Sequence, residues 1–87
     1  MNHLGTVLAN ILAEENLSQR ELAERCGITP TTLHSVIRHG RPCSPDTLRQ
    51  LCGSVSSNLR WRYEVLLAHL RDEADRSGMD PAALLIQ

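Results

Sequence analysis

Residues 17–40 read LSQRELAERCGITPTTLHSVIRHG, a stretch with the start and stop signals of two short helices. Ser18 and Glu21 have the spacing of a capping box, in which each side chain bonds a free backbone amide at the start of a helix. Leu17 and Leu22 flank the box and can pack against each other as a hydrophobic staple. The pattern therefore predicts that the first helix of the pair begins at residue 18 or 19.

A glycine closes this first helix, and a cap followed by a proline opens the second. Gly27 has no Cβ atom, so it can adopt the left-handed conformation in which many helices end. Thr29 can cap the next helix. Pro30 suits the first position of that helix, because a backbone N–H there has no hydrogen-bond partner within the helix and its absence in proline costs nothing. We expect that helix to end at Gly40 and to bury Leu33, Val36 and Ile37.

Outside this stretch the sequence predicts only further helices. Apolar residues recur at helical spacing toward both ends of the chain, and Ser44-Pro45 repeats the opening of cap and proline. Serines and Asn58 then form a polar break before a longer helix with a wide apolar arc. The helices expected in addition to the central pair cover residues 4–15, 45–55, 59–76 and 81–86.

Length and composition limit both the fold and the function. The chain has 87 residues, 41% hydrophobic and 22% charged, which is the balance of one small globular domain and excludes a large enzyme. Leu and Ala are the commonest apolar residues, which favours an all-α fold. A core of this size buries only about 60% of the unfolded chain's surface, so self-association is expected.

The formal net charge of −1 is an average over segments of opposite sign. Residues 18–49 carry five arginines against three acidic residues, and residues 50–71 carry three arginines against Glu64. Residues 72–87 carry four acidic residues against Arg76. The near-neutral total therefore does not argue against a polyanionic partner. The acidic end is either simply solvated or keeps that end of the molecule away from such a partner.

Neither metal chemistry nor catalysis is indicated. Cys26, Cys43 and Cys52 contain no CxxC pair. Their spacing to His34 and His39 matches no zinc-ligand pattern. The odd number of cysteines and the absence of a signal peptide favour a reducing cytoplasm, and no apolar run reaches the roughly 18 residues that span a bilayer. We expect no cofactor, no metal, no catalytic residue, no membrane contact and no small-molecule substrate.

The caps, the turn and the apolar positions together resemble a known family. Ala23 is small enough for a second helix to cross it, Gly27 makes the turn, and polar residues open the second helix. The stretch LSQRELAERCGITPTTLHSVIRHGRPCSPDTLRQLC resembles the Cro and lambda-repressor family, also called XRE-type, of bacterial and phage regulators. With the first helix, the resemblance covers residues 4–55. The alternative is a nonfunctional three-helix packing unit, because it needs the same apolar positions.

This resemblance implies a fold, a layout and a partner. The fold class is all-α, with the four to five short helices of the lambda-repressor-like DNA-binding domain plus a C-terminal helical extension. Residues 1–55 would form the helix-turn-helix DNA-binding domain. Residues 56–87 would form the extension, which we interpret as a dimerisation element. The implied partner is double-stranded DNA, with the second helix of the motif in the major groove.

The family's DNA contacts transfer only to positions that match its pattern. Gln19 would bond a phosphate and brace the neighbouring helix, Arg38 matches an arginine common in the family, and Arg41 lies in the following loop near the DNA backbone. Polar side chains on the second helix would face base edges. The implied set is Gln19, Thr29, Thr31, Thr32, His34, Ser35, Arg38 and Arg41.

Departures from the family pattern leave the DNA sequence unspecified. Ile37 stands where many relatives carry Glu, and His39-Gly40 is expected to extend the second helix by one residue. The base-reading positions hold no Gln, Asn or Arg for strong bidentate contacts. Threonine methyl groups can contact thymine methyl groups, and His34 can donate to a guanine acceptor.

The segment after residue 55 has more apolar surface than four short helices can cover. A homodimer would cover it and suits a protein that binds two half-sites. The expected dimer interface consists of Leu66, Leu70, Leu84, Leu85 and Ile86. In the alternative, both C-terminal helices fold back and complete the core of a monomer.

Two functions fit the sequence. The first is a sequence-specific transcriptional regulator, a repressor that binds a palindromic operator as a homodimer through the major groove. The second is an antitoxin-like or phage-encoded adaptor, in which the C-terminal segment holds another protein and DNA binding is secondary.

Overall fold

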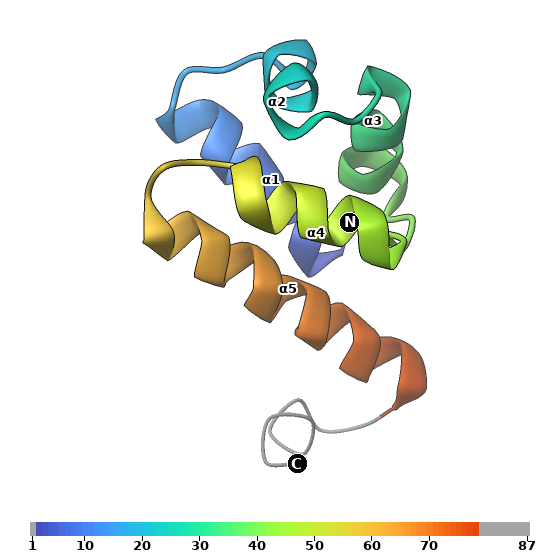
Figure 1. Cartoon of the computed structure of the whole chain (residues 1–87). Helices are drawn as coiled ribbons and strands as arrows, with labels where there is room; N and C mark the ends of the chain where they lie inside the picture. The colour runs from blue at the N-terminus through green and yellow to red at the C-terminus, as the bar shows by residue number, and fades with distance from the viewer. Residues whose placement is uncertain (1, 79–87) are drawn as a thin grey trace.

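The computed structural model describes residues 2–78, which form five α-helices and no strand. The helices are α1 (His3–Glu14), α2 (Gln19–Cys26), α3 (Pro30–His39), α4 (Pro45–Ser54) and α5 (Leu59–Ser77). Figure 1 shows α2 and α3 at one end of the molecule and α5 packed across α1 and α4. The all-α fold class is confirmed, while the helix expected at 81–86 lies outside the described residues. No helix in the described range is long and apolar enough to cross a membrane.

The caps expected from the sequence set the boundaries of α2 and α3. The Ser18 hydroxyl accepts a hydrogen bond from the Glu21 amide at 3.0 Å, and the Glu21 carboxylate accepts one from the Ser18 amide at 3.1 Å. The bond from the Ser18 backbone is the largest cause that holds the pKa of Glu21 below its usual value. Gly27 and Gly40 end α2 and α3 with φ of +71° and +63°, left-handed values that glycine adopts without strain.

Helices α1 and α3 approach each other closely at a glycine of α1. A Cβ atom at Gly5 would lie 2.9 Å from the carbonyl oxygen of Ile37 and 3.1 Å from that of Val36. A side chain at this position would therefore push the two helices apart. Gly5 thus allows the C-terminal half of α3 to sit directly on α1.

All five helices contribute to a single hydrophobic core. Among its members is Cys26, whose thiol pKa is raised to about 11 by burial, so the group behaves as a small neutral hydrophobe. The core consists of Leu4, Leu8, Ile11, Leu22, Ala23, Cys26, Leu33, Val36, Ile37, Leu51, Val55, Trp61, Val65 and Ala68.

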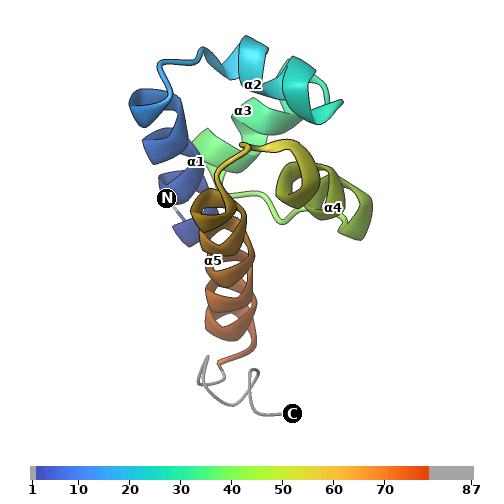
Figure 2. The same ribbon diagram turned by 60° about the vertical axis from the view of Figure 1, so that its left-hand side comes forward.

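Helix α5 has two apolar sides, and one of them packs on the core. This buried side carries the three core residues Trp61, Val65 and Ala68. The other side carries Leu59, Tyr63 and Leu66, which are 65%, 68% and 42% exposed. Figure 2 shows that α5 extends away from the α2 and α3 end of the fold. Part of the segment after residue 55 therefore completes the core, while a second apolar side of α5 faces solvent.

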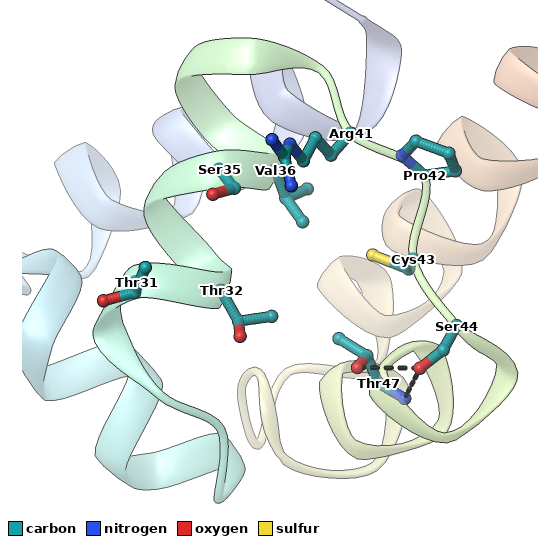
Figure 3. Close-up of a pocket in the computed structure, with 9 residues that line it drawn as sticks. All are labelled: Thr31, Thr32, Ser35, Val36, Arg41, Pro42, Cys43, Ser44 and Thr47. Carbon is teal, nitrogen blue, oxygen red and sulfur yellow. Dashed lines mark hydrogen bonds between the residues drawn. The ribbon is translucent and has the colours of Figure 1, made fainter.

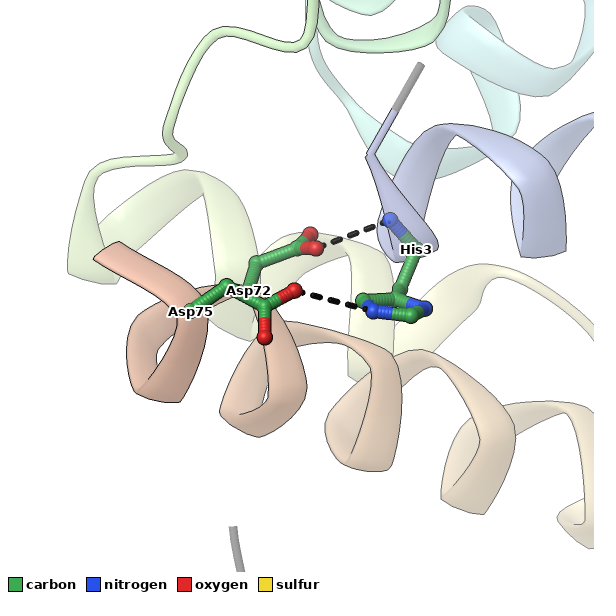
Figure 4. A group of neighbouring side chains, drawn as sticks. All are labelled: His3, Asp72 and Asp75. Atoms are coloured by element: carbon green, nitrogen blue, oxygen red, sulfur yellow. Dashed lines mark hydrogen bonds and ion pairs between the residues drawn. The ribbon is translucent and has the colours of Figure 1, made fainter. Parts of the chain in front are cut away.

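A buried carboxylate on α5 caps the first helix. Asp72 is 5% exposed, and its two oxygen atoms accept hydrogen bonds from the amides of His3 at 2.8 Å and Leu4 at 3.0 Å. The His3 ring also contacts the Asp75 carboxylate at 3.0 Å (Figure 4). The interpretation of the acidic end as simply solvated is therefore wrong for Asp72, because the positive N-terminal end of α1 binds its charge.

A second polar contact fixes the turn between α4 and α5. The hydroxyl of Ser56, a buried residue, donates to the Glu15 carboxylate at 2.6 Å and accepts from the Asn58 amide at 3.0 Å. The Arg62 side chain donates to the Ser56 carbonyl at 2.9 Å. The end of α1 and the start of α5 are thus joined to the same turn.

Candidate nucleic-acid interface

The outer side of α3 carries a row of polar side chains. The opposite side of the helix is buried through Leu33, Val36 and Ile37. The outer residues follow the i, i+3, i+4, i+7 spacing of one helical face, and all are exposed except the half-buried serine. We call this row the α3 ridge, and it consists of Thr31, His34, Ser35 and Arg38.

Thr29 and Thr32 form the start of α3. The Thr29 hydroxyl oxygen accepts a hydrogen bond from the Thr32 amide at 3.1 Å, and the two hydroxyl oxygens lie 2.8 Å apart. Thr29 is therefore the cap that the sequence predicts, with Pro30 in the first turn. Their contacts with DNA stay predictions, and the Thr29 oxygen would have to make one in addition to these two bonds.

A pocket of about 240 Å³ adjoins the α3 ridge on the side of α4. Figure 3 shows that the Arg41 side chain extends from the loop after α3 toward Ser35 and Val36. On the α4 wall, the Ser44 hydroxyl donates to the Thr47 hydroxyl at 3.0 Å and accepts from the Thr47 amide at 3.2 Å. The pocket is thus bordered by hydroxyl groups on two helices and by one guanidinium group.

Ser44 and Thr47 are interface candidates that the sequence analysis missed. They line the same pocket as Thr31 and Ser35 of the ridge, although they belong to the next helix. The sequence did carry a signal for them, the cap and proline at Ser44-Pro45. That signal was used only to predict where a helix begins. A cap at a helix start also marks a positively polarised end, which is a favourable place for a phosphate.

On its other side, the α3 ridge contacts α2. Oε1 of Gln19 and Nδ1 of His34 lie 3.2 Å apart, so the first residue of α2 reaches the middle of α3. The ring of His34 also packs edge to face with that of His39, with centroids 5.7 Å apart. Gln19 therefore contacts the neighbouring helix, while its bond to a phosphate stays a prediction.

The ridge lies in a part of the sequence without carboxylates. Between Glu24 and Asp46 the chain has no acidic residue but has Arg25, Arg38 and Arg41. Arg38 and Arg41 are exposed, and neither forms an ion pair with any of residues 2–78. Both guanidinium groups are therefore available to a phosphate, which they can bind through parallel hydrogen bonds.

Two other groups of reactive side chains have structural explanations. His3, Asp72 and Asp75 bring three possible metal ligands within 4.8 Å of one another, but both Asp72 oxygens bond amides at the positive end of α1, which opposes a cation. Burial raises the thiol pKa of Cys43 to about 11 and that of Cys52 above its usual value. Neutral thiols are poor nucleophiles, so neither cysteine is activated for nucleophilic attack.

The expected dimer residues divide into two groups. Leu66 and Leu70 lie on the outward side of α5, the first exposed and the second half-buried. A pocket of about 260 Å³ opens beside them, lined by Cys52, Arg62, Tyr63 and Leu66. The remaining three, Leu84, Leu85 and Ile86, lie outside the described residues.

The geometry of α2 and α3 defines a helix-turn-helix protein. The two helices are joined by the left-handed turn at Gly27, and the second presents the polar ridge. A family model described as helix-turn-helix matches residues 8–53, from within α1 to nearly the end of α4. No curated protein and no solved structure matches the chain. The chain belongs to the helix-turn-helix family of the Cro/C1 type, also called XRE, and is a DNA-binding transcription regulator of that type.

Proposed function

We propose that the protein represses transcription by binding a palindromic operator as a homodimer, with one α3 in the major groove of each half-site. The α3 ridge is the observation that carries this proposal. An α-helix fits the width of the major groove, where side chains on its outer face meet base edges. Repression requires only that the occupied operator blocks access to the promoter.

Groups on both sides of the ridge support the same placement. In the proposed placement, Thr31 and Ser35 face base edges. Arg41 and the first turn of α4 border one side of the ridge. Gln19 borders the other side through its contact with His34. Phosphates line both edges of the major groove, so polar groups on both sides of α3 fix the register of the protein on DNA.

The outward side of α5 supports the homodimer. Leu59, Tyr63, Leu66 and Leu70 follow one another at intervals of four, three and four residues, the spacing of a coiled-coil seam. Helix α5 packs on α1 and α4 rather than on α3, so a second copy bound to its outward side leaves the ridge free. In this proposal residues 1–55 bind DNA and residues 56–87 pair the two copies.

The described seam is small for a stable dimer. Four side chains cover a few hundred Å², whereas standard interfaces bury roughly 800 Å² per partner. We therefore expect a weak dimer in solution that binding to two adjacent half-sites strengthens. The proposed compartment is the cytoplasm of a prokaryotic cell, where thiols such as the three free cysteines stay reduced.

Selection of bound fragments from a random DNA library tests the proposal. The expected result is an inverted repeat with half-sites centred about 10 base pairs apart, bound with an affinity that falls steeply with salt. Recovery of no sequence from a folded sample at about 50 mM salt would contradict DNA recognition. Recovery of a single half-site without an inverted copy of it would contradict the homodimer and leave DNA recognition standing.

A second candidate is the protein-binding adaptor, which the pocket beside Tyr63 and Leu66 favours. Deletion of residues 79–87 separates the two candidates. Loss of the dimer and of DNA binding together supports the repressor. A deletion variant that still binds DNA as a dimer, but no longer co-purifies with a second protein, supports the adaptor.

A further inference from the structure

The contact between Gln19 and His34 determines which hydrogen-bonding group His34 offers to a ligand. A neutral imidazole has one N–H donor and one acceptor nitrogen, and the bond at one nitrogen fixes the role of the other. With the Gln19 amide in the orientation that the structure gives it, Oε1 accepts and Nδ1 of His34, at 3.2 Å, is the donor. The neutral ring therefore carries its proton on Nδ1 and keeps a lone pair on Nε2.

Nε2 of His34 is available to a ligand. Among residues 2–78 it has no hydrogen-bond partner, and the side chain is exposed. The edge-to-face contact with His39 limits rotation of the ring from a second direction. A ring that is held by two contacts before binding loses little conformational freedom when a ligand arrives.

We propose that His34 acts as a hydrogen-bond acceptor in the major groove and selects adenine or cytosine at one position of each half-site. The proposal rests on the proposed function, because it requires α3 to lie in that groove. The donors that base edges offer there are the amino groups of adenine N6 and cytosine N4, whereas guanine and thymine offer acceptors. This role is the reverse of the guanine contact expected from the sequence, which did not take the bond to Gln19 into account.

The tautomer can be tested without DNA. The nitrogen-15 chemical shifts of the His34 ring at neutral pH distinguish a protonated from an unprotonated ring nitrogen. We expect the Nδ1-protonated form in the wild type and in His39→Ala, and a mixture of both forms in Gln19→Ala. An Nε2-protonated ring in the wild type, or an unchanged tautomer in Gln19→Ala, would overturn the inference. Circular dichroism checks that each variant is folded.

The base preference is tested by selecting DNA with the wild type, His34→Ala and a control variant, His69→Ala, on α5. We expect one half-site position at which the wild type prefers adenine or cytosine about tenfold, a preference that His34→Ala loses and His69→Ala keeps. Enriched sequences with no position that depends on His34, or a preference there for guanine or thymine, overturn this inference and leave the proposed function standing. If no sequence is enriched, both fail.

Discussion

The carboxylate of Asp72 lies 3.0 Å from the amide nitrogen of Leu4, although 68 residues separate the two in sequence. With its bond to the His3 amide, Asp72 serves as a cap for α1 that is supplied from α5. The crossing at Gly5 then joins α1 to the end of α3. Helix α3 is therefore supported by α1, whose first two amides bond a carboxylate of α5.

Replacing Asp72 should destabilise the fold. Asp72→Ala leaves two amides at the start of α1 without acceptors, and we expect the free energy of unfolding to fall by about 1–3 kcal/mol. Urea denaturation followed by the fluorescence of Trp61, which is buried, measures the change. The matched control is Asp75→Ala, whose side chain is 66% exposed and should cost less than about 0.5 kcal/mol. Equal losses in the two variants would contradict the cap.

Two glycine substitutions should have opposite effects. Gly5→Ala places a methyl group 2.9 Å from the Ile37 carbonyl oxygen, so we expect a loss of about 1–3 kcal/mol in the free energy of unfolding. Gly53, inside α4, has no atom within 4 Å of a Cβ atom, so Gly53→Ala should raise stability by about 0.5–1 kcal/mol. Thermal denaturation of both variants provides the comparison. A neutral Gly5→Ala would show that α1 and α3 can separate without cost.

The arginines beside the α3 ridge should contribute to the salt dependence of binding. Arg38→Ala and Arg41→Ala should each weaken binding to all sequences and reduce the slope of log affinity against log salt by about 1. Neither side chain forms an ion pair within residues 2–78, so thermal stability should be unchanged. Fluorescence anisotropy at several salt concentrations measures the slope, with Arg71→Ala on α5 as the control. A slope that stays at the wild-type value in both variants argues against phosphate contacts there.

A charge on the outward side of α5 should separate the copies. Tyr63 is 68% exposed, so Tyr63→Glu should leave the monomer folded but bury a carboxylate in any interface on this side. We expect sedimentation equilibrium to show a monomer and DNA affinity to fall at least about tenfold. Arg71→Glu, outside the apolar row, should leave the dimer intact. If Tyr63→Glu remains a dimer, copies pair elsewhere.

The buried thiol of Cys26 should make stability depend on alkaline pH. Burial raises its pKa from 9.0 to about 11, so the folded state keeps the proton to higher pH than the unfolded state does. The linked stability is complete below pH 9 and is lost as the pH rises from 9.0 to about 11. The loss is on the order of 2 kcal/mol. Cys26→Ala should lose less stability over this interval, as measured by urea denaturation at both ends, and parallel curves for the two proteins would contradict the assignment.

Local signals were sufficient to predict the helix-turn-helix. The Ser18 and Glu21 box, the Thr29 cap and the two glycines that follow α2 and α3 act within three or four residues of sequence, so their chemistry is visible before folding. For this reason the ends of α2 and α3 match the expectation closely.

Long-range contacts were not predictable in the same way. Helix α5 has apolar residues on two sides, and periodicity alone does not show that Trp61 rather than Tyr63 faces the core. Asp72 carries no local sign of burial, because its partners are amides at the other end of the fold. The α3 ridge follows from helical spacing, whereas the bond from Gln19 to His34 depends on how α2 and α3 cross.

The bond between Asp72 and Leu4 also sets an order of events during translation. The ribosome completes α1 through α4 before it adds residue 72, so the first turn of α1 stays without its carboxylate partner until most of α5 has been made. Chains interrupted before that point contain the whole helix-turn-helix but lack this support. We therefore expect nascent and truncated chains to be less stable than finished ones.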